Sequence, residues 1–453
     1  MQRRSLSFFV FFADSCTGYI SGIRYIIFVL TIPKEGAKDQ KLPWYFSLTA
    51  SVIVILIGIY KKLNIGLIML FGALTLGFLA GLSFIELINV FYSGLVNDIT
   101  VMLVISIILL GILGNILKDT GALGEAVENL HNLVADMRLV SASMPVLIGM
   151  LTVPGGAILS APLCAEAGSK LNLPPHRQAA INIWFRHVLY FILPIFPSLI
   201  LASQISGVSI SRFMLINLPL TLIGLISGFY LLFRGYEPIS TGFNFSWLRL
   251  WKLIRTILPL IFIMLLVVLF ELYFPLAIAA GVILALINYL PAEKCIATVI
   301  ERLKTMIIPG IKLPVALVII GIMVYKEMLE ESAVLTDMTN LVLGLGIPVL
   351  FLIIFIPFLV GMLTGDNSAS IAIVFPLFIP LLPVGDTLAF SAYAAYIYSS
   401  STAGHIISPA HPCFALTKEY FKEDIRGIVL PLLPLLLIVM LAGLIITLLL
   451  ERL

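Results

Sequence analysis

Ten long apolar stretches constrain the fold of this 453-residue chain more than any other feature of its sequence. A helix that crosses a bilayer needs about 20 mostly apolar residues, and these stretches approach or exceed that length. Hydrophobic residues make up 60% of the chain and charged residues 11%, whereas about 25% are charged in an ordinary soluble domain. The sequence therefore predicts an all-α, multi-span protein of the cell (cytoplasmic) membrane. The predicted spans are residues 44–60, 64–82, 98–117, 179–206, 213–233, 256–273, 276–291, 310–329, 387–416 and 428–450.

The composition and the absence of several motifs exclude other classes of protein. The net charge is +3 without a block of basic residues, so we expect no nucleic-acid partner. The four cysteines lie far apart and form no CxxC pair, which indicates neither a zinc site nor a disulfide framework. The sequence contains no HExxH motif, no GxSxG motif and no P-loop. We therefore expect that the protein is not an enzyme and holds no cofactor.

Two further apolar stretches, 143–167 and 347–383, are interrupted by Pro, Gly and small polar residues. Each predicts a re-entrant hairpin that enters and leaves the membrane on the same side. If neither stretch crosses, the Lys and Arg residues of the loops alternate between the two sides as the positive-inside rule requires. Residues 83–97, which carry no Lys or Arg, then form an external loop, and Arg212 is the one clear exception to the rule.

The N-terminal segment 1–43 fits this scheme poorly, because its apolar part is broken by Asp14 and Arg24 and is followed by a polar stretch. Three interpretations remain open. The segment is an extra span, a signal-like segment that is not cleaved, or sequence upstream of the true start codon.

The two halves of the chain repeat each other. PVLIGMLT at 145–152 matches PFLVGMLT at 357–364, and at the same offset of 212 KDTGAL at 118–123 falls on EESAVL at 330–335. Farther along, at an offset of 215, a second set of residues matches, in which Pro194 and Pro197 fall on Pro409 and Pro412. Three matches in the same order indicate an internal duplication.

An odd number of crossings in the first copy places the second copy upside down in the membrane. The predicted fold has two inverted-topology repeats, each of about five transmembrane helices plus one re-entrant hairpin, an arrangement typical of secondary transporters. The first repeat covers 44–233, a cytoplasmic connection covers 234–255, and the second repeat covers 256–453.

The motifs GMLTVPGGAILSAP, GMLTGDNSASIAIVFP and STAGHIISPAHP resemble the paired hairpins and broken helix of the ion transporter superfamily. That superfamily includes gluconate, citrate and dicarboxylate carriers, the membrane subunits of arsenite pumps and the large membrane subunit of tripartite periplasmic transporters. The closest likeness is to an uncharacterised, mainly prokaryotic integral-membrane family within it, over about 44–453. The resemblance implies a scaffold part and a mobile transport part that moves as an elevator, and a homodimer formed through the scaffold.

The second hairpin carries the strongest candidate residues. Asp366 is an ionisable residue inside a membrane segment, where such residues are costly and mostly functional; it could instead cap a helix. Side-chain oxygens, among them that of Ser370, surround it, as a hard cation such as Na⁺ requires. The candidates for binding are Thr364, Asp366, Asn367 and Ser368, of which the last three could hold Na⁺, and Ser401, Thr402 and His405 of the broken helix.

The first hairpin is poor in side-chain oxygens and rich in glycine, which favours backbone contact with an anion. Its candidate residues are Thr152, Gly155, Gly156 and Ser160. Arg186 could hold a carboxylate through two hydrogen bonds. His187, His405 and His411 could relay protons, although a structural hydrogen bond is the simpler role for each of them.

The sequence therefore predicts a secondary active transporter for a small, anionic, carboxylate-type solute, with Na⁺ or H⁺ as the coupling ion. The alternative is a cation/proton antiporter without an organic substrate, in which Asp366 exchanges Na⁺ for H⁺. In both cases the expected partners are the solute or ion and the lipid bilayer.

Overall fold

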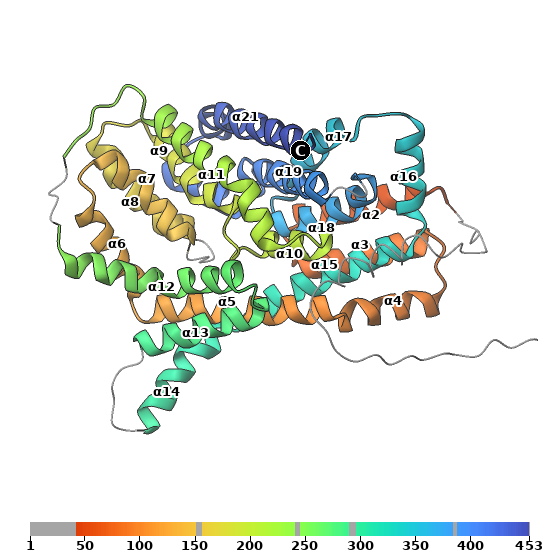
Figure 1. The fold of residues 1–453 in the computed structure, drawn as a ribbon, viewed down its shortest axis with the longest axis horizontal. Coiled ribbons are helices and arrows are strands. Elements are labelled where there is room, and N and C mark those ends of the chain that lie inside the picture. Colours follow the sequence, from red (N-terminus) through yellow and green to blue (C-terminus); the bar gives the residue numbers. More distant parts are fainter. Residues whose placement is uncertain (1–41, 151–155, 241–244, 290–295, 384–386, 453) are drawn as a thin grey trace, which may run out of the picture. The chain divides into compact units, whose positions relative to one another are not determined.

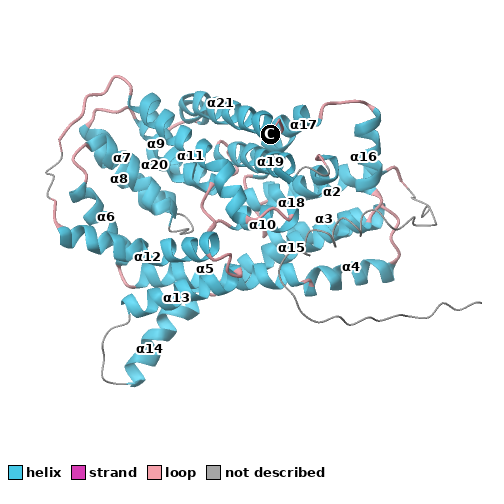
Figure 2. Ribbon diagram, in the orientation of Figure 1, coloured by secondary structure: helices cyan, strands magenta, loops and turns pink. Residues whose placement is uncertain are grey.

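The computed structural model describes residues 42–150, 156–240, 245–289, 296–383 and 387–452. Nearly all of this part is helical (Figure 2), and its one isolated β-bridge joins Asp136 and Ser240. The alternatives for the N-terminal segment fall on residues outside the described part.

The first half of the chain forms ten helices among the described residues, with a short 3₁₀ turn, η1 (Val188–Phe191), after the eighth of them. They are α2 (Trp44–Tyr60), α3 (Ile65–Leu79), α4 (Phe84–Val96), α5 (Asp98–Asp119), α6 (Ala122–Leu133), α7 (Met137–Met150), α8 (Gly156–Lys170), α9 (Pro175–His187), α10 (Pro197–Ser206) and α11 (Ile210–Phe233).

The second half reproduces this order of long, short and broken helices. Its helices are α12 (Trp247–Leu269), α13 (Phe274–Tyr289), α14 (Ile296–Ile307), α15 (Leu313–Glu331), α16 (Val334–Gly344), α17 (Val349–Thr364), α18 (Asn367–Phe378), α19 (Thr387–Ile406), α20 (Pro412–Phe421) and α21 (Ile425–Leu450). Helix α12 begins inside the stretch 234–255 that was predicted to be a connection.

The helices of the two halves also pack reciprocally. Helix α3 packs against α15, as α13 packs against α5 (Figure 1), and α10 packs against α18, as α20 packs against α8. In each half the two helices of the predicted hairpin pack against each other, α7 on α8 and α17 on α18. The contact of α3 with α15 is therefore repeated by their counterparts α13 and α5, and the contact of α10 with α18 is repeated by α20 and α8.

Five helical stretches among the described residues are long and apolar enough to cross a membrane by length and composition. They are Asp98–Asp119, Ile210–Phe233, Trp247–Leu269, Thr298–Glu331 and Ile425–Leu450. Other predicted spans form shorter apolar helices, such as α2, α3 and α13.

Two predicted spans, 179–206 and 387–416, are interrupted, the second of them in the motif STAGHIISPAHP that resembles a broken helix. The first breaks between His187 and Pro197, and the second between Ile406 and Pro412. Proline lacks a backbone N–H and disfavours helical backbone at the residue before it. Two prolines three residues apart in each stretch therefore end one helix and start another.

The predicted external loop 83–97 is also wrong in its local structure, because it forms α4. Ser83 caps this helix in a capping box with Glu86, which satisfies backbone N–H groups at the helix start. Among the residues of the helix, Phe84 and Ile85 are exposed. Residues 84–96 therefore form a short amphipathic helix, although the absence of Lys and Arg indicated only a connecting loop.

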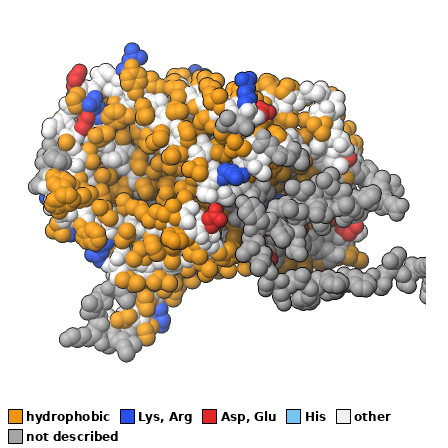
Figure 3. All heavy atoms as spheres, in the orientation of Figure 1, with side chains coloured by type: hydrophobic (Ala, Val, Ile, Leu, Met, Phe, Trp, Pro, Cys, Tyr) orange, Lys and Arg blue, Asp and Glu red, His pale blue; other side chains and the backbone are white. Residues whose placement is uncertain are grey.

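Apolar side chains cover most of the described surface visible in Figure 3, and charged side chains are few there. Phe78 of α3, Ile226 of α11 and Leu441 of α21 are each more than half exposed. A soluble monomer rarely shows extended apolar surface, so this surface suits a lipid environment. The polar side chains that concern function lie inside the molecule.

Candidate functional site

Two pairs of helices form the site: α10 packs against α18, and α20 packs against α8. A cluster of buried polar side chains lies at each pair. We call the first group the Asn367 cluster, which comprises Ser198, Asn367, Ser370, Tyr398, Ser401 and Thr402. We call the second group the Arg186 cluster, which comprises Arg186, His187, His405, His411 and Cys413.

Asn367, the first residue of α18, organises its cluster. Its Nδ2 donates to Ser198 Oγ at 3.0 Å and to Thr402 Oγ1 at 3.1 Å. Ser401 Oγ lies 3.3 Å from Asn367 Oδ1 and 2.7 Å from Ser370 Oγ. Neutral oxygens from α10, α18 and α19 thus meet in a place that excludes water, and such oxygens are suitable ligands for a hard cation.

Tyr398 connects this cluster to the broken helix of the first half. Its hydroxyl donates to the backbone carbonyl of Tyr190 at 2.6 Å and lies 3.4 Å from Ser198 Oγ. Thr402 Oγ1 donates to the Tyr398 carbonyl one turn earlier in α19, at 2.8 Å. The cluster is therefore held by groups from both halves of the chain.

Asp366 caps α18. Its Oδ1 accepts from the backbone N–H of Ala369 at 2.8 Å, and its backbone carbonyl accepts from Thr364 Oγ1 at 3.1 Å. Gly365 before it has φ +63°, and a Cβ there would lie 2.7 Å from Ala410, so only glycine fits this turn. The Asp366 carboxylate and the Asn367 amide therefore have different hydrogen-bond partners, although they are neighbours in the chain.

The Arg186 cluster lies at the start of α8. Arg186 is 4% exposed, and a Cβ at Gly156 would lie 2.5 Å from its Nη2. The absence of a side chain at Gly156 thus makes room for the guanidinium at the first residue of the helix. Both the guanidinium and a helix N-terminus attract anions.

The other members of this cluster are imidazoles and a thiol. Cys413, in the first turn of α20, interacts with His187 and Arg186. His187 and His411 approach each other through their Nε2 atoms at 3.0 Å, and the rings of His405 and His411 have centroids 3.9 Å apart. The fold thus brings His187 to two histidines that are more than 200 residues away in the sequence.

The structure brings together some of the predicted site residues and not others. Asn367, Ser401 and Thr402 meet in one cluster. In the other region Arg186 meets Gly156, and His405 meets the other two histidines. Ser368 follows Asn367 in the first turn of α18 and is partly exposed. Ser160 donates to the Gly156 carbonyl within α8 at 3.2 Å. Thr152 and Gly155 lie outside the described residues.

Three members of the clusters were not predicted: Ser198, Tyr398 and Cys413. A signal for two of them exists in the repeat, because Ser198 and Cys413 each directly follow one of the matched prolines. Each is the second residue of a helix, α10 or α20, that packs against a hairpin of the other half. Nothing in the local sequence marks Tyr398.

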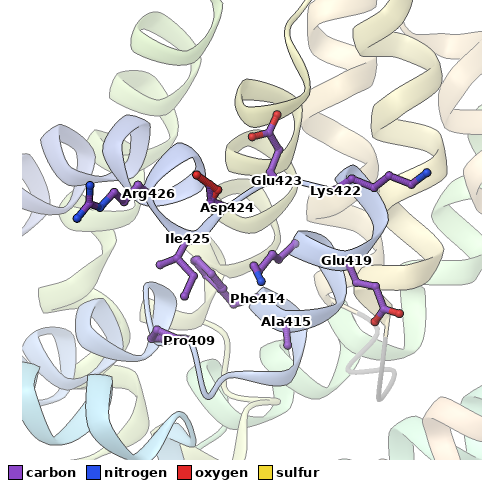
Figure 4. Close-up of a pocket in the computed structure, with 10 residues that line it drawn as sticks. Pro409, Phe414, Ala415, Glu419, Lys422, Glu423, Asp424, Ile425 and Arg426 are labelled. Atoms are coloured by element: carbon purple, nitrogen blue, oxygen red, sulfur yellow. The ribbon is translucent and has the colours of Figure 1, made fainter.

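A surface pocket of about 1050 Å³ opens beside the break between α19 and α20. Pro409 of that break lines it together with Phe414 and Ala415 of α20, and the three lie near one another in Figure 4. Charged residues of both signs line the rest: Lys418, Glu419, Lys422, Glu423, Asp424 and Arg426. Because Pro409 is two residues from His411, the pocket reaches the segment that carries the Arg186 cluster.

Comparison with known proteins finds solved structures of similar fold. The crystal structure of the Alcanivorax borkumensis YdaH transporter, described as having an unusual topology, superposes with a TM-score of 0.60. Its sequence is 15% identical, and the match covers 88% of this chain and 97% of that chain. At this identity the likeness establishes the fold alone.

No curated protein matches the chain in sequence. The comparisons name none of the gluconate, citrate or dicarboxylate carriers, so that relationship stays a prediction. Residues 45–450, however, match the model of a family described as "Protein of unknown function (DUF401)". Because the match spans nearly the whole chain, the protein belongs to the DUF401 family.

Proposed function

We propose that the protein is a secondary active transporter that moves a small, anionic, carboxylate-type solute across the cell membrane, coupled to Na⁺ or H⁺. The observation that carries this proposal is the pair of buried polar clusters, which lie where helices begin at matching positions of a repeat. Secondary transporters bind their substrates between such repeats, at the ends of interrupted helices. The fold shared with a transporter structure supports the same function.

The proposed architecture is a pair of inverted repeats. The reciprocal packing of α3 on α15 and of α13 on α5 supports a two-fold relation between the halves. With an odd number of crossings in each half, the hairpins α7–α8 and α17–α18 would enter the membrane from opposite sides. We propose that these hairpins and the broken helices move together as the elevator part.

The Arg186 cluster is the proposed site of the solute anion. A guanidinium forms two parallel hydrogen bonds with a carboxylate, and the Arg186 side chain is buried. The start of α8 adds backbone N–H groups on the same side. A buried cation of this kind favours an anionic over a neutral solute.

The Asn367 cluster is the proposed site of the coupling cation. Na⁺ prefers oxygen ligands, and Asn367, Ser401 and Thr402 supply an amide and two hydroxyls. Because the Asp366 carboxylate caps α18, we place the cation at Asn367 and the hydroxyls rather than at the three consecutive residues Asp366 to Ser368.

The alternative, a cation/proton antiporter, is favoured by one observation. Asp366 is the one carboxylate in the turn between α17 and α18, and it is only partly exposed. In that mechanism the carboxylate would alternate between Na⁺ and H⁺, and no organic solute would be transported.

The test uses purified protein reconstituted in liposomes. A thermal-shift screen against dicarboxylates, tricarboxylates and sugar acids first selects a solute that stabilises the protein, since binding to the native state raises Tm. Uptake of that solute, radiolabelled, is then measured with and without inward Na⁺ and pH gradients. We expect gradient-dependent uptake that Arg186→Gln strongly reduces at solute concentrations near the wild-type KM, whereas Arg177→Gln, on the same helix, leaves it unchanged.

Proton release on addition of Na⁺ without any solute separates the two functions. A Na⁺-driven proton flux, with no uptake of any anion in the screen, would replace the symporter by the antiporter.

A further inference from the structure

Three of the five histidines of the chain come together at the end of α9 and at the break between α19 and α20. His187, His405 and His411 are 0%, 4% and 5% exposed. One ring nitrogen from each lies within 4.8 Å of the others. His405 and His411 lie six residues apart in one segment, and the fold brings the distant His187 to them.

The hydrogen bonds of two of these rings fix which nitrogen carries the proton. His187 Nδ1 lies 2.7 Å from the Ile183 carbonyl, and His411 Nδ1 lies 3.3 Å from the Gly365 carbonyl. A carbonyl can only accept, so both Nδ1 atoms must donate. In the neutral rings both Nε2 atoms then hold lone pairs, and they face each other at 3.0 Å. Two lone pairs at this distance require a positive group between or beside them.

His405 supplies a third nitrogen. Its Nδ1 is fully buried and has no hydrogen-bond partner among the described residues, although a buried polar atom is nearly always paired. Its ring packs against His411 and lies 6.0 Å from His187, centroid to centroid.

We propose that His187, His405 and His411 bind a divalent transition-metal ion of the Zn²⁺ class. Such ions take imidazole nitrogen at about 2.0–2.1 Å, and imidazole suits Zn²⁺ far better than Mg²⁺ or Ca²⁺. In metal sites a ligating histidine commonly donates its other ring N–H to a backbone carbonyl, which orients the ring. His187 and His411 have this arrangement.

The three imidazoles are the protein ligands of the proposed site, and a water or solute molecule would complete four-coordination, as in metal sites that keep an open position. The site is distinct in chemistry from the neutral oxygens of the Asn367 cluster, which suit Na⁺. The inference concerns binding alone and holds whether or not the protein transports a carboxylate.

The test uses full-length protein without a histidine tag, stripped of metals and kept in detergent. Co²⁺ is titrated and its visible absorption recorded, because a four-coordinate site with nitrogen ligands gives visible bands. Tm is measured with and without equimolar Zn²⁺. For wild type we expect saturation near one Co²⁺ per chain and a rise in Tm with Zn²⁺.

Two variants and two controls assign the site. His405→Gln and His411→Gln should each weaken Co²⁺ binding at least about tenfold, since even losing an outer partner of a ligand costs that much. His131→Gln and His176→Gln, at the two remaining histidines, should bind as wild type does. Size-exclusion profiles identify any variant that fails to fold, and His405→Gln keeps the turn hydrogen bond of His411 intact.

Two results would overturn the proposal. One is folded wild-type protein with neither Co²⁺ bands nor a Zn²⁺-dependent rise in Tm, as expected if the histidines share only a proton. The other is a Co²⁺ titration that His405→Gln and His411→Gln leave unchanged.

Discussion

The Asn367 cluster and the Arg186 cluster occupy equivalent positions in the two halves but differ in chemistry. At the offset of 215 that aligns the prolines, Ser198 corresponds to Cys413 and Thr402 to His187. Ser401 likewise corresponds to Arg186. The same pair of broken helices therefore presents neutral hydroxyls at one position, and a guanidinium, imidazoles and a thiol at the other.

We infer that the shared order of helices sets where the helix ends lie, and that a few side chains set the ligand chemistry. Oxygen ligands select hard cations, whereas nitrogen and sulfur select transition metals, and a buried guanidinium selects anions. The two proposed ion sites can therefore differ although the helices around them are arranged alike.

The largest effect should follow from filling the helix contact that both halves share. In α17, a Cβ at Gly361 would meet the backbone carbonyl of Ser401, and in α7 a Cβ at Gly149 would meet that of Arg186. Gly361→Val and Gly149→Val should each lower stability by about 3 kcal/mol or more, the upper range for overpacking, because backbone must shift. Tm by fluorescence-detected size exclusion measures the loss.

Gly124→Ala is the control, since nothing lies within 4 Å of the added Cβ there. If only one of the two valine variants loses stability, the two halves do not share this packing. The two clusters would then not occupy equivalent positions.

The second effect concerns the charged cluster alone. Arg186→Gln should raise the KM for the anionic solute about 10- to 100-fold, as expected for losing a charge-assisted hydrogen bond of about 1.5–3 kcal/mol. Arg186→Lys keeps the positive charge and should restore part of the affinity that Arg186→Gln loses. The restoration should be incomplete, because an ammonium cannot form the two parallel hydrogen bonds of a guanidinium. Initial uptake rates in proteoliposomes give the KM of both variants. An unchanged KM in both variants would place the anion elsewhere.

The third effect concerns the neutral cluster. Asn367→Ala should raise the Na⁺ concentration for half-maximal uptake roughly 2- to 10-fold, since one oxygen ligand of about 1 kcal/mol is lost. The KM for the solute at saturating Na⁺ should stay the same. A change in solute KM with no change in Na⁺ dependence would reverse the assignment of the two clusters.

Much of the order of helices and helix breaks could be predicted from the sequence. The repeated PVLIGMLT and PFLVGMLT placed the two hairpins, and the proline pairs marked both breaks, because proline acts on the backbone next to it. The same reasoning failed for 83–97, since a loop without Lys or Arg gives no information about local helix formation. The offset also aligned the clusters, although the partners of each side chain could not be inferred from it.

The site itself was only partly predictable, because its contacts join segments that are distant in the chain. His187 and His411 are 224 residues apart, and no spacing rule connects them. Asn367 was predicted from its place in the hairpin, but its partner Ser198, 169 residues away, was not. Side chains that meet through tertiary packing leave no local signal, whereas turns and helix ends do.

The smallest effect should come from Asp366, and it decides between its two roles. Asparagine caps a helix about as well as aspartate, whereas alanine costs about 0.5–2 kcal/mol. If the carboxylate only caps α18, Asp366→Asn keeps both Tm and gradient-driven uptake, and Asp366→Ala lowers Tm while uptake by the folded fraction persists. Loss of all gradient-driven flux in Asp366→Asn at unchanged Tm would instead make the carboxylate part of ion exchange. The coupling cation would then bind in the turn before α18, and that turn would be a third ion-binding region besides the two clusters.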